Sequence, residues 1–140
     1  MDELNTAIFI QENLKVMIID DDDFQIDFVV DQLAELGIDQ VVKANSGVGA
    51  LSMFDLEQPK PDLLICDIQM PDLDGFDIMK ALEERSYGGG VILMSGQGAR
   101  VLHSAALVAR LARQDFLGTV EKPVQKEELG RAIEKMIARR

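Results

Sequence analysis

The chain has 140 residues, 47% of them hydrophobic and 28% charged, which is the size and composition of one globular domain with a single core. Its 14 basic and 25 acidic side chains give a net charge of −11, and such a surface repels phosphate backbones, so we expect no direct contact with nucleic acid. The lone cysteine, Cys66, excludes an intrachain disulfide and a zinc cluster.

Residues 1–13 are expected to form a short N-terminal extension, followed by one domain at residues 14–140. The acidic start Met1-Asp2-Glu3 has the wrong charge for a signal peptide. No apolar run approaches the roughly 18 residues that cross a bilayer. These features predict a cytoplasmic protein that does not contact a membrane.

Five short segments are predicted to be β-strands, because most of them are continuously apolar, as strands covered on both faces are. They are Val16–Ile19, Asp39–Ala44, Leu63–Cys66, Val91–Met94 and Phe116–Val120.

Apolar residues at helical spacing lie between and after these strands. The helices are expected near residues 26–33, 50–54, 75–82, 99–113 and 129–136. A cap at Asn45 or Ser46 precedes the second of them. Strands that alternate with helices in this way form right-handed βαβ units, so the chain is predicted to be a doubly wound α/β domain with a parallel sheet.

Polar side chains follow four of the five predicted strands, at the point where each strand ends. These are the run Asp20–Asp23, Asp67, Ser95 and Lys122, in chain order. Each feature alone has an ordinary explanation, since acidic runs favour helix N-termini and lone lysines are usually at the surface. Their joint placement predicts a site, because ligands of such sheets bind beyond the carboxyl ends of the strands.

The chemistry of this site follows from its charges. Two carboxylates about 4–5 Å apart repel by roughly 3–4 kcal/mol at an effective dielectric near 20, and a hard cation such as Mg²⁺ (or Mn²⁺) relieves that repulsion. A metal and a lysine together can offset the charge of a phosphoryl group. Asp67 stands alone at its strand end, so we favour it as the carboxylate that accepts the group.

The chain resembles the receiver domains of bacterial two-component response regulators over about Leu14–Ile137. The segments that carry the resemblance are Ile18–Asp22, Asp62–Pro71, Asp74-Gly75, Ser95 and Lys122-Pro123. The resemblance implies a flavodoxin-like (βα)5 fold, with the five parallel strands in the order 2-1-3-4-5. It also implies a phosphorylated signalling switch that acts on no other substrate.

The resemblance further assigns roles to individual residues. Asp67 becomes the phosphoacceptor, Ser95 the hydroxyl that binds the phosphoryl group, and Lys122 its ion-pair partner. The metal ligands become Asp20 (through water), Asp21, Asp67 and the backbone carbonyl of Gln69. Gln69 and Gln97 match positions that tune dephosphorylation, and a cis peptide is expected before Pro123.

Two departures from the family pattern stand out. Thr119 occupies a switch position where the family usually has an aromatic residue. The stretch from Ser95 to Lys122 is longer than usual and is similar to receivers that precede EAL phosphodiesterase domains. The single histidine, His103, is expected to lie on the surface or in the packing of the fourth helix.

Partners follow from the resemblance as well. A sensor histidine kinase or a histidine phosphotransfer protein would supply the phosphoryl group, and a downstream effector protein or domain would read the result. The readout surface, and a homodimer, are expected on the face of the fourth helix, fifth strand and fifth helix, with Val101–Leu111 as an apolar patch.

Three other functions would use part of the same residue pattern. A haloacid-dehalogenase-type phosphatase would use Asp20 as its nucleophile, but it needs an acidic motif after the lysine, where only Glu127 and Glu128 follow. A flavin-binding domain would need a phosphate-binding loop after the first strand, but this chain has the acidic run at that place. The third alternative is a receiver that is no longer phosphorylated and serves only as an interaction module. A test of whether the protein takes up a phosphoryl group would distinguish this module from the switch.

Overall fold

A computed structural model describes residues 13–96 and 115–139 of the chain. Strands and helices alternate through the first part, as the sequence predicts. The strands are β1 (Lys15–Ile19), β2 (Gln40–Ala44), β3 (Leu63–Asp67), β4 (Gly90–Ser95) and β5 (Asp115–Glu121). The helices are α2 (Asp23–Glu35), α3 (Gly47–Leu56), α4 (Gly75–Glu84) and α6 (Lys126–Ala138).

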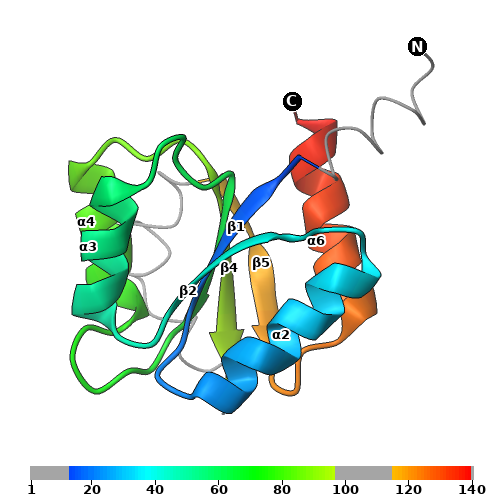
Figure 1. Cartoon of the computed structure of the whole chain (residues 1–140), viewed down its shortest axis with the longest axis horizontal. Helices are drawn as coiled ribbons and strands as arrows, with labels where there is room; N and C mark the ends of the chain where they lie inside the picture. Colours follow the sequence, from blue (N-terminus) through cyan, green and yellow to red (C-terminus); the bar gives the residue numbers. More distant parts are fainter. Residues whose placement is uncertain (1–12, 97–114, 140) are drawn as a thin grey trace.

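The five strands form one sheet in the order β2-β1-β3-β4-β5, and every neighbouring pair is parallel. Helices α2 and α6 cover one face of the sheet, and α3 and α4 cover the other (Figure 1). The predicted fold class and strand order are therefore confirmed. The predicted fourth helix, with His103, and the N-terminal extension up to residue 12 lie outside the described residues.

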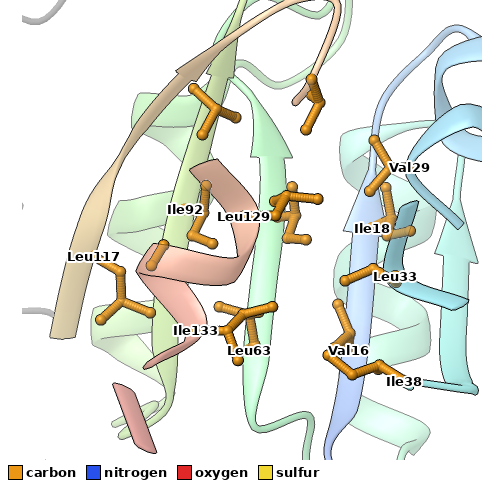
Figure 2. Packing of buried hydrophobic residues seen from close by; sticks show 14 of the residues in the cluster. Val16, Ile18, Val29, Leu33, Ile38, Leu63, Ile92, Leu117, Leu129 and Ile133 are labelled. Carbon is orange, nitrogen blue, oxygen red and sulfur yellow. The ribbon is translucent and has the colours of Figure 1, made fainter. Parts of the chain in front are cut away.

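The interior strands are buried on both faces, because their alternate side chains enter two separate cores. Val16 and Ile18 of β1 pack under α2 and α6, as Figure 2 shows. Met17 and Ile19 pack under α3 and α4 on the opposite face. Strands β3 and β4 are buried at every position, which is why these segments are continuously apolar in the sequence.

Helix caps fix where the loops at the carboxyl edge of the sheet begin. Asp22 caps α2 by accepting a hydrogen bond from the backbone N–H of Phe24. Ser46, one of the two predicted caps, starts α3. Asp74 and Asp77 form a reciprocal capping box at the start of α4. None of the helices in the described ranges is both long and apolar enough to cross a lipid bilayer.

Strand β5 carries an irregularity that the sequence analysis did not predict. Val91 pairs with Phe116 and Ile92 pairs with Gly118, so Leu117 is an extra residue in β5. Gly118 has φ +133°, a conformation that residues with a Cβ rarely adopt. The glycine therefore permits a β-bulge that shifts the register by one residue. After the shift, Ser95 pairs with Glu121, the residue before Lys122.

Candidate functional site

The strand register aligns the polar residues at one edge of the sheet. Ile19 of β1 is level with Cys66 of β3, so Asp20 and Asp67, the residues that follow them, leave the sheet side by side. Asp67 is level with Met94, and the next residue of β4, Ser95, is level with Glu121 of β5. The backbone N–H of Lys122 donates to the carbonyl of Ser95 at 2.9 Å. Four strand ends thus meet, as predicted.

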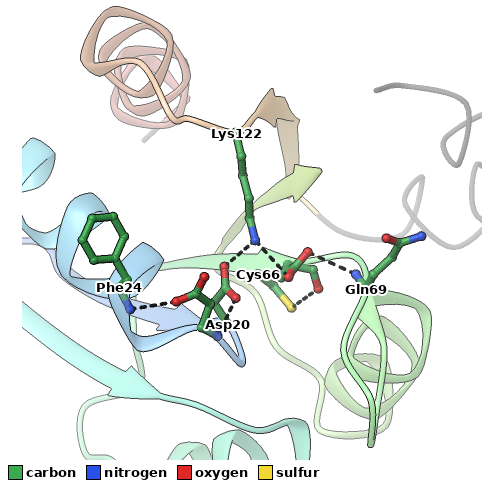
Figure 3. Close-up of polar contacts among 7 residues, drawn as sticks. Asp20, Phe24, Cys66, Gln69 and Lys122 are labelled. Atoms are coloured by element: carbon green, nitrogen blue, oxygen red, sulfur yellow. Dashed lines mark hydrogen bonds and ion pairs between the residues drawn. The ribbon is translucent and has the colours of Figure 1, made fainter. Parts of the chain in front are cut away.

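Lys122 joins the two buried acids of the site. Its Nζ lies 2.7 Å from Oδ2 of Asp20 and 3.0 Å from Oδ2 of Asp67. The Asp20 side chain is 0% exposed and that of Lys122 is 16% exposed. Figure 3 shows the lysine side chain reaching from its strand end to both carboxylates. One cation is therefore shared by two carboxylates inside the protein.

Burial and charge perturb both partners. Burial raises the pKa of the Asp20 carboxyl above its ordinary value, the hydrogen bond from Lys122 opposes this rise in part, and the negative charge of Asp67 adds to it. Burial alone would lower the pKa of Lys122, but its hydrogen bonds with Asp20 and Asp67 outweigh that effect and hold the pKa above the ordinary value. The folded protein thus disfavours the ionised form of Asp20 and favours the charged form of Lys122.

The site has the donor set of a hard cation. Asp20, Asp21 and Asp67 each offer one carboxylate oxygen, and these three atoms lie within 4.8 Å of one another. Asp21 is exposed, so the cluster is open to solvent on that side. Lys122 pairs with only two of the three acids, Asp20 and Asp67, and oxygen ligands at a site open to solvent are what Mg²⁺ prefers. The residues present therefore fit the predicted divalent metal.

Local hydrogen bonds orient the two buried acids. The backbone N–H of Gln69 donates to Oδ1 of Asp67 at 3.1 Å, and the backbone N–H of Asp22 donates to Oδ1 of Asp20 at 3.0 Å. Each carboxylate is thus held by the turn that follows it, and its other oxygen, Oδ2, faces Lys122. The two turns thus direct both carboxylates towards Nζ of Lys122.

The remaining predicted residues are placed as follows. Ser95 is buried at the end of β4. Thr119 lies on β5, level with Leu93, and its buried hydroxyl oxygen makes no hydrogen bond to a described residue. Gln97 lies outside the described residues. Burial raises the pKa of the Cys66 thiol, in agreement with its interpretation as a small buried residue instead of a nucleophile.

Comparisons with known proteins bear directly on this arrangement. The sequence profile of the response regulator receiver domain matches residues 16–134. The chain belongs to this family. It is 28% identical over 123 residues to the chemotaxis protein CheY of Bacillus subtilis, an alignment that covers 88% of this chain and 97% of that protein.

Solved structures agree with the fold of this receiver domain. A response regulator receiver domain from Clostridium thermocellum matches with a TM-score of 0.75 and 28% identity, covering 90% of this chain and 95% of that one. A chain of the CheX–CheY–BeF3–Mg²⁺ complex from Borrelia burgdorferi matches with a TM-score of 0.74 and 21% identity, covering 87% of each. At that identity, the second likeness concerns the fold alone.

Family membership establishes the broad function. The protein is a receiver domain and a phosphoacceptor signalling switch of the two-component type, and it is a switch instead of a classical enzyme. This decides against the haloacid-dehalogenase and flavin-binding alternatives. The likeness to the receivers that precede EAL domains stays a prediction.

Proposed function

We propose that Asp67 is the phosphoacceptor of this receiver domain, and that it receives its phosphoryl group from a phosphohistidine of a sensor kinase or phosphotransfer protein. The observation that carries the assignment is the shared ion pair of Lys122 with Asp67 and the fully buried Asp20. Asp67 is nearly but not fully buried, whereas Asp20 is 0% exposed, and Asp67 lies in one acid cluster with the exposed Asp21. It therefore combines a nucleophilic oxygen with access for a donor.

The residues around Asp67 suit the transfer. An oxygen of its carboxylate would form the new O–P bond while the N–P bond of the donor breaks, and the released imidazole takes up a proton. Lys122 offsets the charge on the phosphoryl oxygens. Asp20, Asp21, Asp67 and the carbonyl of Gln69 would hold Mg²⁺ or Mn²⁺. When bound, that ion neutralises charge on the phosphoryl oxygens and so promotes both phosphorylation and hydrolysis.

Phosphorylation would then bias two conformations of the domain. The new phosphoryl oxygens offer acceptors to the Ser95 hydroxyl and the Lys122 ammonium, and these contacts exist only in the phosphorylated state. Ser95 ends β4 and Lys122 directly follows β5. The readout face expected from the sequence comprises the fourth helix, the fifth strand β5 and the last helix α6. We propose that an effector, or a second copy of the domain, binds there. We also propose that residues 14–140 form the receiver domain and that the protein acts in the cytoplasm.

The assignment of Asp67 can be tested with a small-molecule phosphodonor. Incubation of the protein with acetyl phosphate and Mg²⁺ should add the mass of one phosphoryl group, measured by intact-protein mass spectrometry. Asp67→Asn should add none, and Asp62→Asn, which alters an acid at the opposite end of β3, should behave as the wild type. A wild-type protein that gains no mass would favour a non-phosphorylated interaction module.

The two glutamines provide a second test of the site. Gln69→Ala and Gln97→Ala are expected to change the lifetime of the phosphoryl group by several-fold, because side chains beside it influence how water reaches the phosphorus atom. The lifetime is measured from the loss of phosphoryl mass after the donor is removed. Gln40→Ala, at the far end of β2, serves as the control. Lifetimes equal to that of the control would reject this role.

A further inference from the structure

The loop that follows Asp67 is fastened to a helix on a different part of the chain. This phosphoacceptor loop comprises residues 68–74. In it, the carboxylate of Asp72 accepts hydrogen bonds from the backbone N–H of Gly47 at 3.1 Å and of Val48 at 2.9 Å. Gly47 and Val48 are the first two residues of α3. Asp72 thus caps a helix that lies about 25 residues earlier in the chain.

The start of α3 shares its free N–H groups between two caps. The N–H of Gly49 donates to Oγ of Ser46 at 2.9 Å, whereas the N–H groups of Gly47 and Val48 depend on Asp72. A negative charge is favoured at this end of a helix. The same backbone hydrogen bonds lower the pKa of Asp72 to about 2, so its carboxylate is ionised at neutral pH.

The loop and the helix also touch closely at Gly47. A Cβ added to this glycine would lie 2.5 Å from Cβ of Leu73 and 2.9 Å from its carbonyl oxygen. No side chain larger than hydrogen fits there without moving the loop. Asp72 thus joins the loop to α3 by hydrogen bonds. The close approach of Leu73 to α3 is possible because residue 47 is a glycine.

The other attachments of the loop explain why this contact matters for the site. Ile68 donates its N–H to Met94 at 3.0 Å, and Gly75 donates to Ile68 at 2.8 Å. Gln69 lies in the loop between Ile68 and Gly75, and its backbone N–H donates to the carboxylate of Asp67. Asp72 attaches the second half of the loop to α3. We expect that a displacement of Asp72 would therefore change the direction of the N–H and the carbonyl of Gln69.

We propose that Asp72 is a positioning residue for the phosphoryl chemistry at Asp67, acting by holding the phosphoacceptor loop against the N-terminus of α3. The inference rests on the proposed function of Asp67. Asp72 itself is exposed and does not touch the acid cluster in any hydrogen bond or ion pair of the described residues. Its effect is exerted through the path of the loop.

The experiment compares two caps of one helix. Asp72→Ala removes the cap that belongs to the loop, and Ser46→Ala removes the neighbouring cap that does not. For each variant, the rate of phosphorylation by acetyl phosphate with Mg²⁺ and the urea midpoint of unfolding are measured. We expect Asp72→Ala to be phosphorylated on the order of tenfold more slowly, since small misplacements of reacting groups cost up to about 100-fold. Ser46→Ala should stay within about twofold of the wild type, although both lose a helix cap.

Two further variants change the same contact between the loop and α3. Asp72→Asn retains one acceptor oxygen and should give an intermediate rate, and Gly47→Ala should slow phosphorylation by displacing the same loop from the opposite side. Equal rates for Asp72→Ala and Ser46→Ala, or a wild-type rate in Asp72→Ala, would overturn the positioning role. A wild-type protein that takes up no phosphoryl group would instead refute the proposed function.

Discussion

Lys122→Met is expected to destabilise the metal-free protein by about 3 kcal/mol, because removing one member of a buried ion pair leaves its partner uncompensated. Here one lysine serves two acids, at 2.7 and 3.0 Å. Asp20 is fully buried and cannot recover its hydration while the protein stays folded. The free energy of unfolding is obtained from urea denaturation in the presence of a chelator.

Two controls isolate this effect. Lys43→Met removes a lysine whose pair with Asp27 is mostly exposed, at 3.7 Å, and should change stability by less than about 1 kcal/mol. The double variant Asp20→Asn/Lys122→Met should recover part of the loss, because the buried charge is removed together with its partner. Equal losses for Lys122→Met and Lys43→Met would show that the shared ion pair contributes nothing of note.

Asp20→Asn is expected to have the opposite effect on the metal-free protein and to remove its response to Mg²⁺. The substitution removes a buried charge and its repulsion with Asp67, so a stabilisation of about 1 kcal/mol is expected. The wild type should gain about 2.7 kcal/mol at a Mg²⁺ concentration one hundred times its Kd. The variant should gain little, since it has lost a carboxylate of the acid cluster.

The pH dependence of this difference has a defined sign. The pKa of Asp20 is raised in the folded protein, so its ionised form opposes folding at neutral pH. As the pH falls through the raised pKa towards the ordinary value of 3.8, the wild type loses this penalty and the advantage of Asp20→Asn should disappear. Asp23→Asn, in the exposed first turn of α2, is the matched control and should respond to Mg²⁺ as the wild type does. A full Mg²⁺ response in Asp20→Asn would contradict the metal assignment.

The fold can be predicted from the sequence because the inner strands are continuously apolar, which few fold classes accommodate. Segments such as Leu63–Asp67 and Gly90–Ser95 are buried at every position, and only helices on both faces can cover them. The polar residues at the ends of four of the five strands then locate the site, since the ends of parallel strands share one edge. Asp20, Asp67 and Lys122 are therefore predictable as a group.

Contacts between distant segments are not predictable in the same way. The acid at position 72 looks like any polar loop residue, and its role depends on how closely α3 approaches the phosphoacceptor loop. The bulge at Leu117 follows from the pairing of β5 with β4, although Gly118 inside a predicted strand is a signal for such irregularities. The choice between Asn45 and Ser46 as the cap of α3 also required the structure.

The most direct measurement of the central claim locates the phosphoryl group within the phosphorylated protein. Acyl phosphates are reduced by borohydride to the corresponding alcohol, which marks the modified aspartate for peptide mass spectrometry. We expect the mark on Asp67 in the wild type, dependent on Mg²⁺, with Asp20 and Asp21 unmodified. A mark on Asp20, or on any acid other than Asp67, would contradict it.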